Sequence, residues 1–156
     1  MLEDLVVAVD LSGGSVIAVI GVREYVLKHP AFSRITSMLK YYREIGGGKK
    51  RSYIRAFPRR YMKLKPYLEV VKIYTYSRDT INQVNELLHE TCPSVAIVDD
   101  RIFNTITYPK KVQEGKVSKD YLKRLVNLAD NLANYFRMLL KNNPERFQEE
   151  LKNFEK

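Results

Sequence analysis

The stretch from Leu5 to Gly21, LVVAVDLSGGSVIAVIG, constrains the fold of this chain more than any other part of the sequence. Its two apolar runs, at 5–9 and 16–20, are rich in β-branched residues, as strands covered on both faces usually are. Between them, Ser12-Gly13-Gly14 predicts a tight turn, because glycine adopts positive φ angles at little cost. The stretch therefore predicts a buried antiparallel hairpin.

Asp10 stands directly after the first apolar run, at a place where the burial pattern leaves no room for a charge. A carboxylate is expensive to bury unless it is paired or binds a metal ion. Two interpretations of Asp10 are therefore open. It caps the turn through the backbone amides, or it belongs to a functional site.

The charge balance and the cysteine content narrow the classes of protein to consider. Lys and Arg number 27 against 18 Asp and Glu, a formal charge of +9, which favours an anionic partner such as nucleic acid. Cys92 is the sole cysteine, so we expect no intramolecular disulfide and a cytoplasmic location. We expect no secretion signal and no membrane-spanning segment. With only His29, His89 and Cys92 as nitrogen and sulfur ligands, zinc is not expected.

The remaining pattern predicts an α/β protein. Apolar residues recur at helical spacing within 23–45, over about 80–90, over 118–142 and over 145–156. Strand patterns appear at 67–76 and 94–98. The two strands and the helix between them predict a βαβ unit, with parallel strands and a right-handed crossover. Residues 103–116 are expected to form a loop. Asp79 or Thr80 is expected to cap the second helix, and Ser118 the third.

Together these patterns predict one domain over residues 1–156. Its mixed sheet would begin with the antiparallel hairpin and continue with parallel strands, and helices would cover both faces. A basic insertion is expected at about 46–66 and a helical extension at about 144–156.

The basic insertion predicts contact with phosphates. No acidic residue occurs between 46 and 65, and positive charges without counter-charges repel one another unless an anion binds. The residues expected to bind nucleic acid are Lys49, Lys50, Arg51, Arg55, Arg59, Arg60 and Lys63.

Aromatic residues alternate with these charges. Tyr53, Phe57 and Tyr61 are placed to stack on unpaired bases, and residues 52–57 are expected to form a short strand before Pro58. The alternative is a solvated cationic loop whose aromatic side chains pack against the body of the protein.

Four acids form the candidate catalytic and metal-binding set: Asp10, Asp99, Asp100 and Asp130. The first three lie at strand ends, where the sites of α/β proteins gather, and the fourth lies on the long helix expected to cover the sheet. Carboxylates brought together repel one another, and divalent cations relieve that repulsion. Alternatives are open for two of them: Asp99 pairs with Arg101 or caps a loop, and Asp130 is a solvated helix residue.

Three motifs, in this order, resemble the RNase H-like superfamily, and within it the YqgF-type, RuvC-related nucleases. VDLSGG at 9–14, followed by IAV, resembles the opening Asp-x-Gly turn and second strand of that family. VDDRIFNT at 98–105 resembles its Asp-Glu-Arg-Leu-Thr-Thr segment after the last strand. ADNLA at 129–133 resembles its closing helix. The chain departs from the family at 74–77, where the family has Gly-x-Pro, and it lacks a glutamate at the end of the middle strand.

The resemblance implies an RNase H-like fold and a metal-dependent nuclease or resolvase acting on structured nucleic acid. Asp10, Asp99 or Asp100, and Asp130 would hold two Mg²⁺ or Mn²⁺ ions, the usual apparatus of phosphodiester hydrolysis. The expected partner is DNA or RNA, and a homodimer is one assembly considered. Because the middle-strand glutamate is missing, a non-catalytic nucleic-acid-binding protein of the same fold is the main alternative. A scaffold subunit that docks a protein partner is the third.

Overall fold

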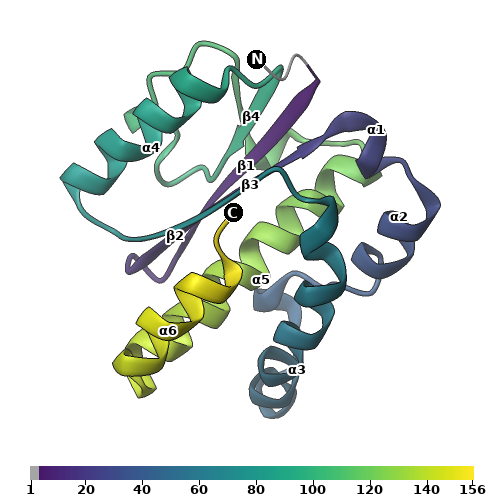
Figure 1. The fold of residues 1–156 in the computed structure, drawn as a ribbon, viewed down its shortest axis with the longest axis vertical. Coiled ribbons are helices and arrows are strands. Elements are labelled where there is room, and N and C mark those ends of the chain that lie inside the picture. The colour runs from purple at the N-terminus through teal and green to yellow at the C-terminus, as the bar shows by residue number, and fades with distance from the viewer. Residues whose placement is uncertain (1–3) are drawn as a thin grey trace.

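A mixed five-stranded sheet forms the centre of the protein (Figure 1). The structure is a computed structural model, and it describes residues 4–156. In the order β3-β2-β1-β4-β5, the strands are β3 (Val70–Thr75), β2 (Val16–Arg23), β1 (Leu5–Ser12), β4 (Val95–Val98) and β5 (Lys111–Gln113). β2 pairs antiparallel with both β1 and β3, whereas β4 pairs parallel with both β1 and β5. The predicted α/β fold with an antiparallel N-terminal hairpin is confirmed.

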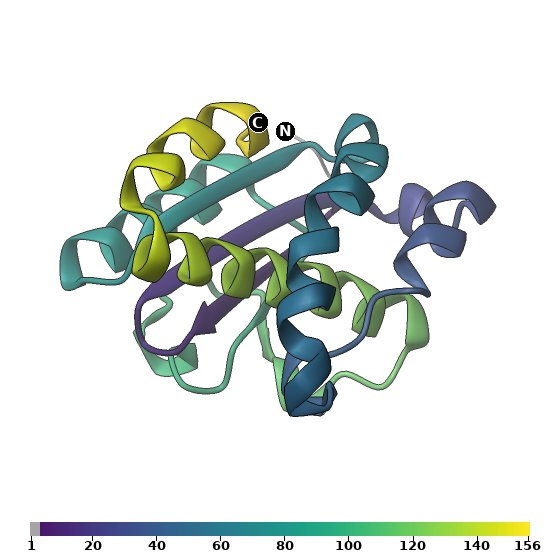
Figure 2. The same ribbon diagram turned by 90° about the horizontal axis from the view of Figure 1, so that it is seen from below.

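Helices cover both faces of the sheet, as predicted (Figures 1 and 2). One face packs against α4 (Arg78–Thr91). The other carries the long helix α5 (Asp120–Asn142) together with four further helices. These are α1 (Glu24–Leu27), α2 (Pro30–Thr36), α3 (Lys50–Leu64) and α6 (Pro144–Phe154). Side chains of β1 alternate between the two layers, so Val6 and Ala8 join the α5 side while Val7 and Val9 join the α4 side. No helix within residues 4–156 is both long and apolar enough to cross a membrane.

The hairpin turn forms as its sequence predicts. Gly13 and Gly14 adopt φ angles of +56° and +68°, and the backbone N–H of Ser15 donates to the carbonyl of Ser12 at 3.0 Å. Asp10 does not cap this turn, because it lies within β1 and pairs with Ala18 of β2. Of the two interpretations of Asp10, the turn cap is excluded and the functional site remains.

The βαβ unit differs from the prediction in one respect. β3 and β4 run in the same direction, but they are not neighbours, because β2 and β1 lie between them.

Helix α4, which connects β3 to β4, is capped by Ser77 and not by Asp79 or Thr80. The Ser77 hydroxyl accepts from the Thr80 N–H at 3.1 Å, and the Thr80 hydroxyl accepts from the Ser77 N–H at 2.8 Å, a reciprocal capping box.

The basic insertion is a helix, which corrects the predicted strand and loop. Within α3, Ile54, Phe57, Tyr61 and Leu64 recur every three or four residues, and all four are buried in the core on the α5 side. Pro58 lies inside the helix and costs it about 3 kcal/mol. Each large apolar side chain buried by the helix stabilises it by about 1.5–3 kcal/mol. Core packing therefore outweighs the proline.

Three further boundaries differ from prediction. Residues 23–45 form only the short helices α1 and α2, with a 3₁₀ turn at Tyr42–Glu44, rather than one long helix. Residues 103–116, expected to be a loop, contain β5 at the sheet edge. Helix α5 begins after Lys119 without a side-chain cap, so Ser118 does not cap it.

Candidate functional site

Three acidic residues meet at the carboxyl ends of the parallel strands β1, β4 and β5. Val98 pairs with Val9 on one side and with the last residue of β5 on the other. The next position along each strand is acidic: Asp10, Asp99 and Glu114. One carboxylate oxygen from each lies within 4.8 Å of the other two. The sheet register therefore assembles a carboxylate trio, which is the name used below for these three side chains.

Asp10 is the most deeply placed member of the carboxylate trio, with 3% of its surface exposed. Burial raises its pKa well above the usual range, and the negative charges of Asp130, Glu114 and Asp99 raise it further. The main influences on this carboxyl group all act in the same direction. A positive charge next to Asp10 would therefore stabilise its ionised form.

Glu114 is the member that the sequence analysis missed. It follows the last residue of β5, and burial together with the charges of Asp99, Asp130 and Asp100 raises its pKa to about 7. The positive charge of Arg101 offsets part of this effect. Glu114 supplies an acid at the edge of the sheet, a position different from the middle-strand glutamate whose absence was noted above.

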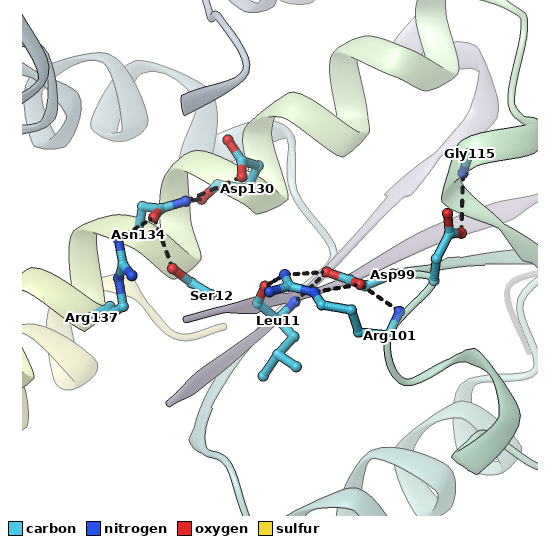
Figure 3. Close-up of polar contacts among 9 residues, drawn as sticks. Leu11, Ser12, Asp99, Arg101, Gly115, Asp130, Asn134 and Arg137 are labelled. Carbon is cyan, nitrogen blue, oxygen red and sulfur yellow. Dashed lines mark hydrogen bonds and ion pairs between the residues drawn. The ribbon is translucent and has the colours of Figure 1, made fainter. Parts of the chain in front are cut away.

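Asp99 is held in place by Arg101 (Figure 3). Its carboxylate accepts from the Arg101 guanidinium at 2.8 and 3.1 Å and from the backbone N–H of Arg101 at 2.9 Å. The backbone N–H of Leu11 donates to it at 3.2 Å. Burial alone would raise the pKa of Asp99, but these hydrogen bonds outweigh burial and lower it. Asp99 is therefore both paired with Arg101 and part of the carboxylate trio.

Asp130 lies on α5, beside the carboxylate trio but outside it. Only 6% of its surface is exposed, which rules out the alternative of a solvated helix residue. Its carboxylate accepts from the backbone N–H of Tyr42 at 2.7 Å and from the Asn134 amide at 3.1 Å. Burial raises its pKa to about 6, although the Tyr42 N–H and the charge of Arg43 oppose the rise. Its charge in turn raises the pKa of Asp10.

Asp100 lies at the rim of the site. It is exposed, and its carboxylate accepts from the backbone N–H of Gly115 at 3.3 Å. It lines an open cleft together with Asp99 and Glu114, but its oxygens do not join the carboxylate trio. The structure thus brings Asp10 and Asp99 together, places Asp130 beside them and leaves Asp100 at the edge.

The predicted basic residues lie on α3 and the turn before it. Arg51, Arg55, Arg59 and Lys63 are spaced four residues apart along the helix, and all four are exposed. Lys49 is exposed, whereas Lys50 and Arg60 are half-buried, with their charges about 5 Å from the rings of Tyr42 and Tyr53. The four ion pairs among residues 4–156 involve Arg23, Lys28 and Arg101, and none involves α3.

Phe57 and Tyr61 of α3 are not free to stack on bases, which corrects the prediction for these two residues, and Tyr53 is half-buried. Phe57 and Tyr61 are fully buried in the core. The Tyr53 hydroxyl donates to Asn131 at 2.6 Å and accepts from the backbone N–H of Lys40 at 2.8 Å. The aromatics pack on the body of the protein, as the alternative interpretation held, and the charges remain at the surface.

Comparison with known proteins supports the fold. No protein-family model matches the sequence, and no curated protein matches it. Seven chains of solved structures match, among them the crystal structure of the ribonuclease H2 from Pyrococcus horikoshii OT3. That match has a TM-score of 0.54 and 16% sequence identity, and it covers 92% of this chain and 78% of that chain. The likeness confirms the predicted RNase H-like fold, while the narrower likeness to YqgF-type and RuvC-related nucleases stays a prediction.

Proposed function

We propose that this chain is a divalent-metal-dependent nuclease that hydrolyses phosphodiester bonds in structured nucleic acid. The observation that carries the proposal is the carboxylate trio, built by three neighbouring parallel strands at their carboxyl ends. The solved neighbour is by its name a ribonuclease, and it shares the fold that creates this edge. The substrate in this proposal is DNA or RNA.

The donor chemistry of the carboxylate trio fits magnesium or manganese. It offers only oxygen ligands, the type that these cations prefer, and no sulfur or nitrogen ligand belongs to the group as found among residues 4–156. Burial and the repulsion of neighbouring carboxylates raise the pKa of Asp10 and of Glu114, and a bound cation would relieve the repulsion. Asp10, Asp99 and Glu114 would hold the first ion, with Asp130 and Asp100 as the nearest candidates for a second.

Bound metal ions would supply Lewis-acid stabilisation of the phosphoryl oxygens and a lowered pKa for the attacking water. The chain's own residues would orient the substrate. The exposed row of Arg51, Arg55, Arg59 and Lys63 on α3 is suited to the phosphate backbone. Because the aromatics of α3 are buried or hydrogen-bonded, this row would contact phosphates without base stacking.

One observation favours the alternative, a non-catalytic nucleic-acid-binding protein. Asp99 already receives a positive charge from Arg101, with guanidinium–carboxylate distances of 2.8 and 3.1 Å. A pair of this kind neutralises a carboxylate that a metal ion would otherwise use. In the alternative, the carboxylate trio would be stabilised by Arg101 and by protonation, and the basic row would bind nucleic acid without cleavage.

Cleavage assays with two matched pairs of variants separate the two functions. Asp10→Asn and Glu114→Gln each remove one charge from the carboxylate trio, and Asp79→Asn and Glu86→Gln remove the same charge from exposed sites on α4. The nuclease predicts magnesium- or manganese-dependent cleavage that falls by orders of magnitude in the first pair only. Metal-free binding should persist in all four variants. A wild-type protein that binds duplex, junction or single-stranded substrates but cuts none of them establishes the binding protein instead.

A further inference from the structure

A second polar pocket adjoins the carboxylate trio. It lies beside the hairpin turn and has a volume of about 230 Å³. Its wall carries four cationic side chains, Arg43, Lys50, Arg101 and Arg137, against a single carboxylate, Asp130. This composition is the reverse of the neighbouring acidic site, and the pocket is suited to an anion.

Arg137 is positioned at this pocket by a hydrogen bond to Asn134 (Figure 3). Its guanidinium donates to the Asn134 side-chain oxygen at 3.1 Å, and the Ser12 hydroxyl donates to the same oxygen at 2.8 Å. Asn134 and Ser12 are both buried. Arg137 also crosses directly over Gly13, where an added Cβ would lie 2.8 Å from the Arg137 Cδ. The absence of a side chain at this turn thus makes room for the arginine.

Three of the four positive charges of the pocket are not consumed by ion pairs among the described residues, whereas the fourth, Arg101, pairs with Asp99. Among the ion pairs of residues 4–156, none involves Arg137, Lys50 or Arg43. The Asp130 carboxylate is occupied by the Tyr42 N–H and the Asn134 amide. Arg137 has five N–H donors, of which one bond to Asn134 is accounted for, so donors remain for a ligand.

The pocket and the acidic cleft form one continuous surface. Tyr41, Arg43 and Arg101 line both, and the cleft continues to Asp99 and Glu114. A strand with one phosphodiester at the carboxylate trio could therefore place another phosphate in the pocket. Planar guanidinium groups bind the oxygens of phosphates and of carboxylates in pairs, which favours an oxyanion over a neutral ligand. A phosphodiester at the adjoining carboxylate trio makes phosphate the oxyanion that a bound strand would bring to the pocket.

We propose that the pocket lined by Arg43, Lys50 and Arg137 is a phosphate-binding site that anchors a nucleic-acid strand next to the bond to be cleaved. The proposal rests on the proposed nuclease function for its substrate, but the site itself acts without metal. The anchored group is either an internal phosphodiester or a terminal phosphate of the strand. Both present the same oxygen chemistry to the arginines.

Metal-free binding of a short oligonucleotide in EDTA tests this site. Arg43→Gln and Arg137→Gln should each weaken binding by about tenfold, as expected for the loss of a charged hydrogen bond. The matched control is Arg34→Gln, which removes the same charge from an exposed position on α2 outside the pocket. Because Arg43 is exposed, its variant should fold even if the Arg137 variant does not. Equal affinities for the wild type, Arg43→Gln and a folded Arg137→Gln would overturn the proposal, as would an equal loss in Arg34→Gln.

Two further measurements locate the ligand and identify its source. Inorganic phosphate titrated into ¹⁵N-labelled protein should shift the amide signals of Gly13 and Asn134 in the wild type and not in Arg43→Gln. Shifts confined to other parts of the protein would contradict the site. Oligonucleotides with and without a 5′-phosphate distinguish the sources, since equal affinity indicates an internal phosphodiester and tighter binding of the phosphorylated strand indicates a terminal one.

The outcomes for the pocket and for the nuclease are separable. A wild-type protein that cleaves nothing, with variants that lose metal-free binding, supports the pocket and refutes the nuclease. A wild-type protein that cleaves, with pocket variants that bind as tightly as it does, supports the nuclease and refutes the pocket.

Discussion

A carboxylate oxygen of Asp10 and one of Glu114 lie within 4.8 Å of each other, although β1, which carries Asp10, and β5, which Glu114 follows, are not neighbours in the sheet. β4 lies between these strands, and its Asp99 completes the group. Burial raises the pKa of both carboxyl groups, and neighbouring negative charges add to it: Glu114 raises the pKa of Asp10, and Asp99 raises the pKa of both. In the metal-free protein, these raised pKa values should make the free energy of unfolding depend on pH.

We expect Glu114→Gln to stabilise the metal-free protein at alkaline pH. The pKa of Glu114 is raised from 4.5 to about 7 in the folded state, so the stability contributed by its protonated form is complete below the unfolded pKa and is lost as the pH rises through about 7. At about pH 8 the variant should exceed the wild type by on the order of 1 kcal/mol, after discounting for partial exposure. The free energy of unfolding from urea titrations measures this difference.

The pH dependence provides the control for that prediction. At about pH 4.5 and below, the advantage of Glu114→Gln should shrink toward zero, because the wild-type carboxyl is then protonated. Glu86→Gln, at an exposed site on α4, should show no comparable dependence. If the free energies of unfolding of Glu114→Gln and the wild type differed by the same amount at every pH, the pKa of Glu114 would not be raised in the folded state.

Magnesium or manganese should raise the melting temperature of the wild type. A cation that binds only the folded state at a hundred times its dissociation constant adds about 2.7 kcal/mol to the free energy of unfolding. The increase should be larger at about pH 8 than at about pH 5, because protons compete for the same carboxylates. Differential scanning calorimetry of the wild type and Asp10→Asn checks this, and an identical increase in both would place the cation elsewhere.

The exposed arginines of α3 should set the salt dependence of nucleic-acid binding. Each phosphate contact on duplex DNA contributes about 0.9 to the log–log slope, so the triple replacement of Arg51, Arg55 and Arg59 by Ala should reduce the slope by up to about three. The matched control replaces Arg34, Lys123 and Lys152, which are exposed on other helices. Fluorescence anisotropy over a range of salt concentrations measures both slopes. An unchanged slope in the α3 variant would show that this helix faces away from the ligand.

Phe57 should act through stability rather than through base stacking. It is fully buried in the core, so Phe57→Ala should lower the free energy of unfolding by about 3–5 kcal/mol. Met62→Ala on the same helix should change it by about 0.5 kcal/mol or less, because 42% of Met62 is exposed. Chemical denaturation tests both. If Phe57→Ala kept full stability and lost affinity for single strands, the stacking interpretation would be restored.

The sequence was sufficient for the hairpin and for two acids of the carboxylate trio. Both apolar runs are continuous and rich in β-branched residues, and the glycine turn between them favours the register observed. Asp10 and Asp99 end or follow such runs, so their placement at one sheet edge follows from strand direction. The sheet order did not follow, because pairing between distant segments has no local signal.

Glu114 could not be predicted because β5 has only three residues, half-buried or exposed. A strand of that length shows no clear alternation, and Gly115 beside it indicates a loop. The local signal is one acid two residues after a single β-branched residue, Val112, and such a pattern occurs too often by chance. The burial of Asp130 was left open by the sequence for a related reason, because the segment that contacts its carboxylate, around Tyr42, is irregular.

The α3 helix was misread because Pro58 and the basic residues dominate its local pattern. The four-residue spacing of Tyr53, Phe57 and Tyr61 is helical, but it was read as strand and loop once proline was treated as a boundary. Tertiary packing decided the outcome, since the buried side chains of α3 contact the core on the α5 side.

The short edge strand β5 has a consequence for how the site opens and closes. It joins the sheet only through parallel pairing with β4 over three residues, 111–113. An edge segment with so few contacts belongs to the low-stability end of local unfolding equilibria. Glu114 would move away from Asp10 and Asp99 each time that segment detached. A cation bound to all three carboxylates would therefore stabilise the pairing of β5 with β4. Slower amide hydrogen exchange along β5 in the presence of divalent metal, with little change in β2, would be the signature of that coupling.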